Sequence, residues 1–200
     1  MMVEAMGLIL GQINQYIARA DGGAPGAPSQ AVWGNIAQLD RAEVATELDN
    51  HLVMSLVKIE EERALRNGKS FVGIGPNEIA YQNRPLNLNL SLLFTANYRN
   101  YGTALRRLAQ LLTFFQGKQK FTAANSPGSL PPLPIGEFSL SMDLISPSFE
   151  EVNHLWGFLG AKALPFALYR GRLVALSDQR VLDGGGRIQE IDVQSRDATA

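Results

Sequence analysis

The sequence contains no cysteine and only two histidines, His51 and His154. Without cysteine the chain cannot form disulfide bonds, bind a metal ion through thiolates or use a thiol as a nucleophile. The absence of disulfides suits an intracellular place of assembly. The 200 residues are 46% hydrophobic. A chain of this length and composition can bury the core of one ordinary domain without cross-links.

The sequence also lacks an excess of charge of either sign. It has 18 basic and 19 acidic residues and no basic stripe that would neutralise a row of phosphates, so we expect no nucleic acid partner. Nowhere does it contain a run of about 20 apolar residues. The segment 1–20 is interrupted by Glu4, Gln12 and Asn14 and has no basic region before it. We therefore expect an amphipathic first helix, neither a signal nor an anchor, and no direct insertion into a membrane.

Apolar residues at three- and four-residue spacing predict helices over residues 2–19 and 99–116. Gly117 is expected to be the C-cap of the second helix. The inner stripe of that helix is predicted to consist of Tyr101, Leu105, Leu108, Leu112 and Phe115. A third, shorter helix is predicted to begin at a capping box formed by Ser148 and Glu151. Its inner residues are expected to be Val152, Leu155, Trp156 and Leu159.

Alternating apolar and polar residues predict several β-strands. The clearest spans residues 86–94, where leucine and phenylalanine alternate with asparagine and serine. Further strands are predicted over 31–37, 50–59, 137–145 and 164–176. The segments 21–28, 60–84 and 122–136 are rich in polar and turn-forming residues and are expected to be irregular.

This order of elements is typical of an α+β fold, because the strands surround the helices instead of alternating regularly with them. We predict a single domain with a mixed β-sheet of four to six strands, flanked by two or three helices. The domain is expected to span residues 1–177. Residues 178–200 are expected to form a polar C-terminal extension, in which residues 187–193 could add an edge strand.

The motifs that would indicate an enzyme each lack a required residue. Residues 67–70 end like a phosphate-binding P-loop, but Arg63 stands where that motif needs its first glycine. Glu151 and His154 have the spacing of one half of a di-iron ligand set, and the other half is missing. The three glutamates at 60–62 are consecutive, so their side chains cannot converge on one metal ion. We predict no catalytic residue, no metal site and no cofactor.

Several blocks of sequence, in the same order along the chain, resemble one protein family. These are residues 57–67 (VKIEEERALRN), 84–90 (RPLNLNL), 93–98 (LFTANY), 114–118 (FFQGK), 121–126 (FTAANS) and 155–162 (LWGFLGAK). They are similar to the N-terminal domain of the cap proteins, or tail terminators, of extracellular contractile injection systems. Virulence-cassette and antifeeding-prophage particles are examples of such systems. The resemblance covers nearly the whole chain.

The resemblance implies a tail-terminator-like fold and a structural role without enzymatic activity. Such proteins are thought to form a six-fold ring that ends the inner tube and meets the last sheath layer. The implied partners are therefore copies of the chain in a hexameric ring, the tube protein and the sheath protein. Assembly would take place in the bacterial cytoplasm, in a particle that is then released or anchored to a membrane. A baseplate or cargo-loading adaptor of the same machine is the alternative, and an enzyme without a recognisable motif is a third hypothesis.

Two segments are candidate protein–protein interfaces. The first carries charges of both signs that could form ion pairs between subunits: Glu60, Glu61, Glu62, Arg63 and Arg66. The second is the end of the helix predicted over 99–116 together with the residues that follow it: Phe114, Gln116, Lys118 and Phe121. Phe115, on the predicted inner stripe of that helix, is expected to lie in the core.

Overall fold

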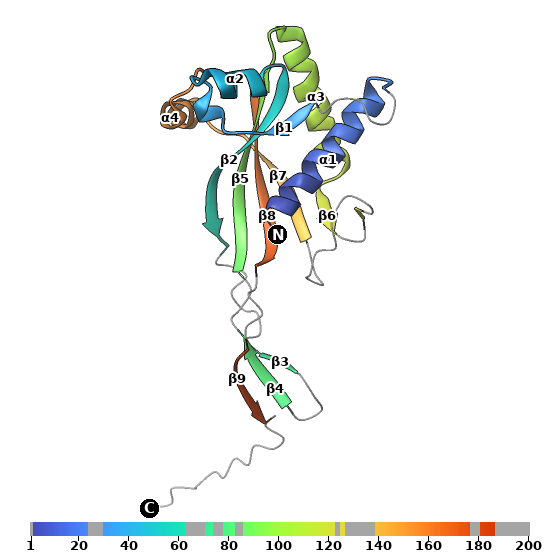
Figure 1. The fold of residues 1–200 in the computed structure, drawn as a ribbon, viewed down its shortest axis with the longest axis vertical. Coiled ribbons are helices and arrows are strands. Elements are labelled where there is room, and N and C mark those ends of the chain that lie inside the picture. Colours follow the sequence, from blue (N-terminus) through green and yellow to red (C-terminus); the bar gives the residue numbers. More distant parts are fainter. Residues whose placement is uncertain are drawn as a thin grey trace, which may run out of the picture. The chain divides into compact units, whose positions relative to one another are not determined.

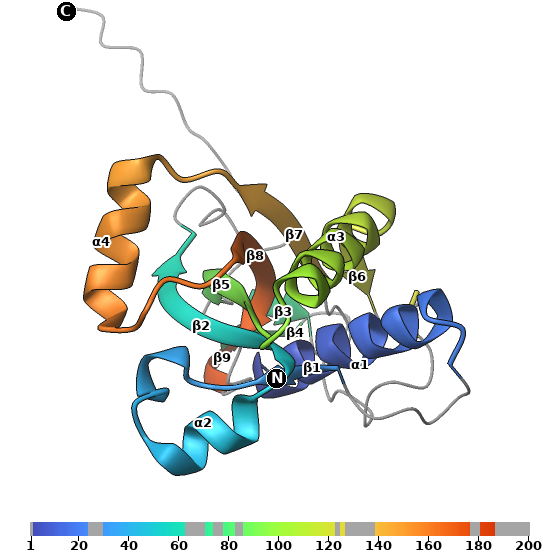
Figure 2. The same cartoon turned by 90° about the horizontal axis from the view of Figure 1, so that it is seen from above.

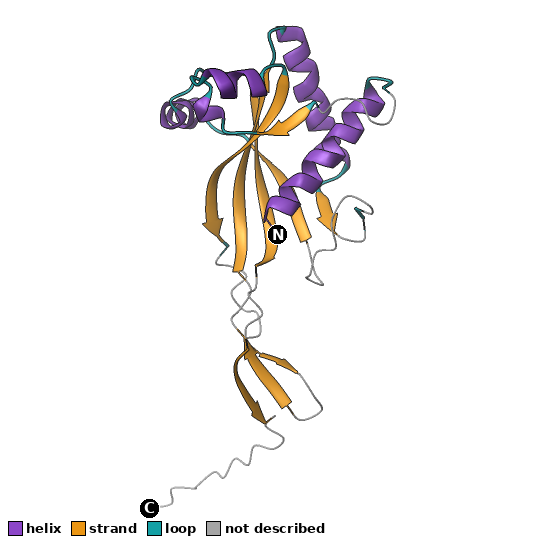
Figure 3. Cartoon of the chain, in the orientation of Figure 1, coloured by secondary structure: helices purple, strands orange, loops and turns teal. Residues whose placement is uncertain are grey.

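The structure is a computed structural model that describes residues 2–23, 30–62, 71–73, 78–82, 86–122, 125–126, 139–176 and 181–186. The chain forms two compact units. The large unit consists of residues 1–63 and 86–176, and the small unit consists of residues 64–85 and 177–200. Both contain a β-sheet, and the helices of the described residues belong to the large unit (Figure 3). The sequence had indicated one domain followed by a polar extension.

The large unit is built on a six-stranded sheet with the order β1-β2-β5-β8-β7-β6 (Figure 1). Its strands are β1 (Ala31–Trp33), β2 (His51–Glu61), β5 (Leu86–Asn97), β6 (Lys120–Thr122), β7 (Ser139–Ile145) and β8 (Phe166–Leu176). β1 runs parallel to β2, and the other neighbouring strands are antiparallel. The sheet is therefore mixed and has six strands, which confirms the predicted α+β class.

Helices cover both faces of this sheet, as the view from above shows (Figure 2). Helices α1 (Met2–Ala20) and α3 (Tyr101–Gly117) pack on one face, which we call the α1–α3 face. Helices α2 (Ala42–Leu48) and α4 (Phe149–Leu159), with the 3-10 turn η1 (Ile36–Gln38), pack on the other, the α2–α4 face. α2 is the helix that the sequence analysis missed.

The α1–α3 face holds the larger of two hydrophobic cores. Leu90, Leu92 and Phe94 of β5 point into it, because alternate residues of a strand lie on the same face of a sheet. The prediction of strand 86–94 is confirmed, and β5 continues three residues further. α1 buries Leu8, Ile9, Ile13 and Ile17 against the same core, which confirms the predicted first helix.

The predicted inner stripe of α3 was partly wrong. Tyr101, Leu105 and Leu112 are 66%, 47% and 39% exposed. The helix buries Phe115, as predicted, together with Ala104, Leu111 and Phe114. α3 has an apolar arc wider than the surface that it buries, and helical periodicity alone does not tell which side of such an arc meets the sheet. Gly117 is not the C-cap either, since the helix includes it and Lys118 is the capping residue in extended conformation.

On the α2–α4 face, the strand predicted over 31–37 ends early, at Trp33. Buried Ser55 of β2 explains the change of direction. Its hydroxyl donates a 2.6 Å hydrogen bond to the Gly34 carbonyl and accepts a 3.3 Å bond from the Ile36 amide. A Cβ atom at Gly34 would lie 2.5 Å from Cδ2 of Leu48, so a larger residue there would force the buried Leu48 side chain to shift.

Helix α4 confirms the predicted capping box. The Ser148 hydroxyl accepts a bond from the Glu151 amide, and the Glu151 carboxylate accepts one from the Ser148 amide. Trp156 is buried and lies edge-on to Phe166 of β8, while Val152, Leu155 and Leu159 are half-buried. Strands predicted over 50–59, 137–145 and 164–176 are confirmed as β2, β7 and β8 with small shifts of their ends.

The small unit is a three-stranded antiparallel sheet with the order β3-β4-β9. Its strands are β3 (Phe71–Gly73), β4 (Glu78–Gln82) and β9 (Val181–Gly186). The prediction that 60–84 is irregular was therefore wrong, because this segment includes the end of β2 and the whole of β3 and β4. The three strands are short and β9 contains three glycines, so none of them shows a clear alternation of apolar and polar residues. Residues 187–193, for which an edge strand was predicted, lie outside the described residues, as does most of 122–136.

Candidate protein–protein interface

The predicted acidic segment lies at the end of β2. Glu60 pairs within the chain, its Oε1 lying 2.6 Å from Nζ of Lys58. Glu62 follows the last residue of β2, and its Oε2 accepts a 2.9 Å hydrogen bond from Nδ2 of Asn89 on β5. Glu61 is exposed. Arg63 and Arg66, predicted to complete this interface, lie outside the described residues, as do residues 67–70 of the P-loop-like segment.

Glu60 belongs to a wider polar surface that the sequence analysis missed. The register places Lys58, Ser91, Arg170 and Asp143 side by side across four strands. Two residues along, it places Glu60, Asn89, Arg172 and Ser141 side by side. We call these eight residues the polar half of the α2–α4 face. Asn89 and Ser91 alternate with buried leucines in the sequence, and this alternation was the available signal.

No described helix covers the polar half of the α2–α4 face. The sheet residues that pack beneath α2 and α4 include Val53, Leu93 and Phe166, at the opposite end of the strands. In Figure 1 the lower parts of β2, β5 and β8 extend away from both helices. Arg172 forms an exposed ion pair with Asp143 across β8 and β7, with 2.7 Å between Nη2 and Oδ2. This surface is polar and charged and is half-buried to exposed, as the rim of a protein–protein interface commonly is.

Of the four residues predicted for the second interface, two lie in the core and two lie at the surface. Phe121 is fully buried and Phe114 is nearly so. Their ring centroids are 6.0 Å apart, and both rings contact Phe115. Phe115 also packs against Tyr169 of β8, at 4.5 Å between centroids. A side chain that the folded chain buries offers no surface to a partner. Phe114 and Phe121 are core residues for this reason, and we withdraw them from the candidate interface.

Gln116 and Lys118 remain at the surface of this region. Gln116 is exposed. Nζ of Lys118 donates 2.8 Å hydrogen bonds to Oε1 of Gln12 and to the carbonyl of Asn125, and it lies 5.0 Å from the centre of the Phe121 ring. Partial burial lowers the pKa of the Lys118 ammonium group, because desolvation disfavours its charged form. Lys118 is therefore held by the fold rather than extended toward solvent.

Asn125 also closes the outer edge of β6. Its Oδ1 accepts a 2.9 Å hydrogen bond from the Thr122 amide, and its Nδ2 donates a 2.8 Å bond to the Lys120 carbonyl. The side chain thus occupies the backbone groups that a further strand would need.

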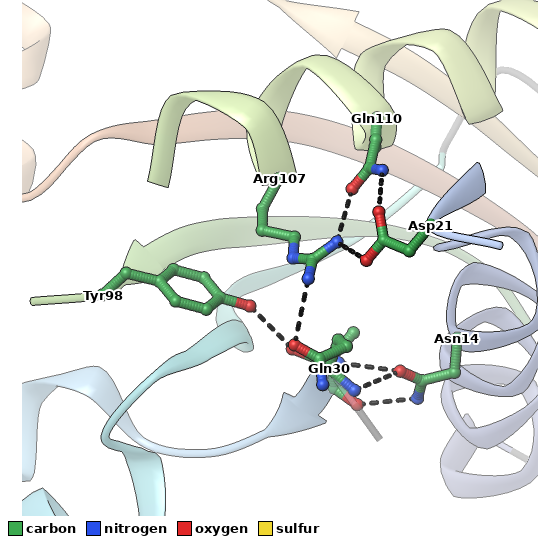
Figure 4. A network of polar contacts seen from close by, with 7 residues as sticks. Asn14, Asp21, Gln30, Tyr98, Arg107 and Gln110 are labelled. Atoms are coloured by element: carbon green, nitrogen blue, oxygen red, sulfur yellow. Dashed lines mark hydrogen bonds and ion pairs between the residues drawn. The ribbon is translucent and has the colours of Figure 1, made fainter. Parts of the chain in front are cut away.

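A network of polar side chains joins α1, β1 and α3 (Figure 4). Arg107 of α3 pairs with Asp21 just after α1, and Gln110 donates a 2.8 Å hydrogen bond to the same carboxylate. Arg107 also reaches Oε1 of Gln30, and the Tyr98 hydroxyl donates to the Gln30 carbonyl at 3.2 Å. The bond from Gln110 and the charge of Arg107 lower the pKa of Asp21, whereas burial raises that of Tyr98.

Asn14 of α1 extends this network along the outer edge of β1. Its Oδ1 accepts bonds of 2.7 and 2.8 Å from the amides of Gln30 and Ala31. Its Nδ2 donates a 2.8 Å bond to the Ala31 carbonyl. The network fixes β1 at the end of the sheet, and each of its residues bonds to another part of the chain, although Nε of Arg107 has no hydrogen-bond partner among the described residues. We assign it a structural role.

The described residues contain no group of three or more histidine, aspartate or glutamate side chains that could hold a metal ion. His154 is exposed on α4, and His51 is half-buried at the start of β2. Searching the same residues, we find no helix that is both long and apolar enough to cross a membrane.

Comparison with known proteins connects the fold to a family. The sequence matches the model of the Pvc16 N-terminal domain over residues 8–190. No curated protein sequence matches it significantly. The fold is similar to the sheath/tube terminator of PVC, an extracellular contractile injection system, whose extended state was solved by cryo-EM. The TM-score is 0.60 and the identity 11%, over 100% of this chain and 65% of that one.

A second similar structure is the tube-terminating cap of the anti-feeding prophage, also solved by cryo-EM. Its TM-score is 0.45 and its identity 15%, over 72% of this chain and 49% of that one. This chain therefore spans 65% and 49% of the lengths of the two proteins. The first likeness shows that the fold is tail-terminator-like.

The family match begins within α1 and ends beyond β9, so it includes strands of both sheets. It also includes all six sequence blocks on which the resemblance was based. The resemblance is thereby confirmed: the chain belongs to the Pvc16 N-terminal domain family.

Proposed function

We propose that this chain is a structural terminator of a contractile injection particle, in which it forms a ring that ends the inner tube and contacts the last sheath layer. The observation that carries the proposal is the likeness of the whole chain to a protein described as a sheath/tube terminator. The family match over residues 8–190 supports it. The absence of an assembled catalytic or metal-binding cluster among the described residues is compatible with a purely structural role.

In this role the partners are the tube protein, the sheath protein and further copies of the chain in a hexameric ring. A ring needs two different faces on each subunit, one complementary to the other, and a terminator needs a third face that accepts no further layer. The polar half of the α2–α4 face and the surface around Gln116 are two distinct exposed regions of the large unit. Assembly would take place in the bacterial cytoplasm, before the particle is released or anchored to a membrane.

Deleting the gene in a strain that makes the particles tests the proposed function. Electron microscopy should show tubes or sheaths of uncontrolled length, or no particles, because nothing would stop tube growth at a fixed layer. Particles of normal length would contradict the proposal. Crosslinks to the last tube layer would support the terminator, whereas crosslinks to spike or baseplate proteins would favour a baseplate or cargo-loading adaptor.

The charged segment at 60–66 is the part of the proposed ring interface that mutation can test directly. The double substitution Arg63→Glu and Arg66→Glu should prevent ring assembly, measured by native mass spectrometry, while circular dichroism shows a folded monomer. Arg41→Glu, at an exposed position before α2, is the matched control and should leave rings intact. Rings that form equally well with both sets of substitutions would place the interface elsewhere.

A further inference from the structure

Among the described residues, no strand pairs with the outer edge of β2 beyond the point where β1 ends. β1 pairs with β2 only as far as Trp33 opposite Met54, whereas β2 continues to Glu61. The Met54 carbonyl accepts a bond from the Gly34 amide, so Met54 faces β1, and Leu56 two residues later faces the same side. Among the described strands none lies beside β2 on that side after Met54 (Figure 1). We call the outer edge of residues 56–60 the β2 margin.

The backbone of Ile59 also faces the β2 margin. The Glu62 amide donates to the Asn87 carbonyl of β5, so Glu62 faces β5. Lys58 and Glu60 face the same way, because successive residues of a strand direct their backbone groups to opposite neighbours. Ile59, between them, therefore points its amide and carbonyl away from β5. The irregularity between Leu56 and Lys58 explains why Leu56 and Ile59, three residues apart, face the same side.

The two ends of the large sheet differ from the β2 margin, because asparagine side chains close them. Asn14 bonds to the outer backbone groups at β1, and Asn125 bonds to those at β6. Open strand edges promote unwanted pairing, and proteins commonly cover them. The described residues close two edges of the sheet with side chains and leave the β2 margin unpaired, so this margin is suited to pairing with another chain.

The side chains at the β2 margin indicate what would bind there. Ile59 is 49% exposed and presents an apolar side chain at this margin. Where β1 ends, a pocket of about 480 Å³ is lined by residues that include Val3, Trp33 and Leu56. Residues 58–62 comprise one lysine, one isoleucine and three glutamates, a net of two negative charges, with Glu60 paired to Lys58 and Glu61 also engaged within the chain. The occupant should therefore place an apolar residue at the pocket and basic residues near the glutamates.

A second copy of the same margin is a poor occupant. Two β2 margins could pair only about a two-fold axis, which would bring the net negative charge of one close to that of the other. Such a contact would also close as a dimer and could not generate a ring.

We infer that the β2 margin accepts an extended segment of a different protein chain as an added strand, with an apolar residue in the Trp33 pocket and lysine or arginine beside Glu60 and Glu61. Main-chain hydrogen bonds to Ile59 would provide much of the affinity, and the pocket and charges would provide selectivity. The inference concerns this edge alone and does not depend on the proposed terminator role.

Binding of synthetic peptides to the purified full chain tests this inference. The probe is a labelled ten-residue peptide of alternating threonine and valine that carries one leucine near one end and three lysines near the other. A second peptide replaces the lysines with glutamates. A third keeps the lysines and is N-methylated at alternate amides, so that it cannot donate hydrogen bonds to a strand edge. Fluorescence anisotropy measures affinity, and hydrogen exchange locates the protected amides.

The lysine peptide should bind at least tenfold more tightly than the glutamate peptide, and the N-methylated peptide should lose binding. The amide of Ile59 should become protected from exchange. On the protein, Ile59→Pro removes the outward-facing donor and should weaken binding at least tenfold, while Ile59→Val retains the donor and should bind normally. Because proline is tolerated at the edge of a sheet, circular dichroism of Ile59→Pro should match that of the unmodified chain.

The inference fails if the lysine peptide does not bind, or if it binds no more tightly than the glutamate peptide. Equal binding of the N-methylated peptide would show that strand pairing is not the mode of recognition. It fails as well if light scattering shows a dimer that Ile59→Pro abolishes, since the occupant would then be a second copy. The peptide comparisons use the unmodified protein, so they decide the question even if Ile59→Pro does not fold.

Discussion

The two faces of the large sheet are built from the same strands and yet differ along their length. On the α1–α3 face, β5 buries Leu88, Leu90, Leu92, Phe94 and Ala96 in succession. On the α2–α4 face, β5 buries Leu93 and Thr95, but Asn89 and Ser91 lie beyond the reach of α2 and α4. The described helices therefore cover β5 along its length on the α1–α3 face, but on the α2–α4 face they cover only half of it. We therefore expect stability to reside mainly in the first face, because no described helix covers the polar half of the α2–α4 face.

The largest effect is expected from Phe94→Ala on the α1–α3 face. Phe94 is fully buried and its ring lies 5.6 and 5.7 Å from those of Phe115 and Tyr169. Removing a buried phenylalanine leaves a cavity, and the loss of unfolding free energy should be about 3–5 kcal/mol in urea denaturation. Ser91→Ala, three residues earlier on the opposite face, is the matched control and should change stability by no more than about 0.5 kcal/mol. Similar losses from both would contradict the contrast between the faces.

A smaller effect is expected from Ser55→Ala in the covered half of the α2–α4 face. This substitution leaves the Gly34 carbonyl without the 2.6 Å bond from the Ser55 hydroxyl. Leaving buried polar groups without partners should cost about 1–3 kcal/mol, measured by thermal or urea unfolding. Ser141→Ala, in the uncovered half, makes no such contact and provides the comparison. If Ser55→Ala were neutral, the turn between β1 and η1 would not depend on this hydroxyl.

The smallest effect is expected from Arg172→Ala on the polar half of the α2–α4 face. The Arg172–Asp143 pair is about half exposed, and exposed ion pairs contribute at most about 1 kcal/mol. The difference in unfolding free energy between Arg172→Ala and the unmodified chain should shrink further in about 1 M salt, because salt at that concentration screens most of the attraction between exposed charges. Arg170→Ala removes a neighbouring exposed charge that makes no ion pair with the described residues, and it is the control. A loss of several kcal/mol would show that this surface is part of the folded core.

Local signals in the sequence predicted those elements whose structure depends on their own residues. The alternation at 86–94 gave the correct strand and the correct buried face for Leu88 to Phe94, because both follow from the two-residue period of a strand. The capping box at Ser148 was recognisable for the same reason, since its two hydrogen bonds join residues three positions apart.

The parts that could not be predicted depend on distant residues. Trp33 ends β1 because Ser55, 21 residues from Gly34, holds the turn that follows. The buried side of α3 was misjudged because Leu105 and Leu112 extend the same apolar arc as Leu108, and only the position of the sheet decides which of them it covers. The polar half of the α2–α4 face is assembled from four strands. No single segment of the sequence contains enough of that surface to reveal it.

The register of the small sheet has a consequence for the order of folding during synthesis. Ile79 of β4 pairs with Gly185 of β9, so about a hundred residues must leave the ribosome before that ladder can close. The pairs of the large sheet involve only residues up to Leu176, and they can form earlier. A nascent chain would therefore carry β4 with one edge unoccupied until the last strand is made. Translation itself would set the moment at which the small sheet becomes complete.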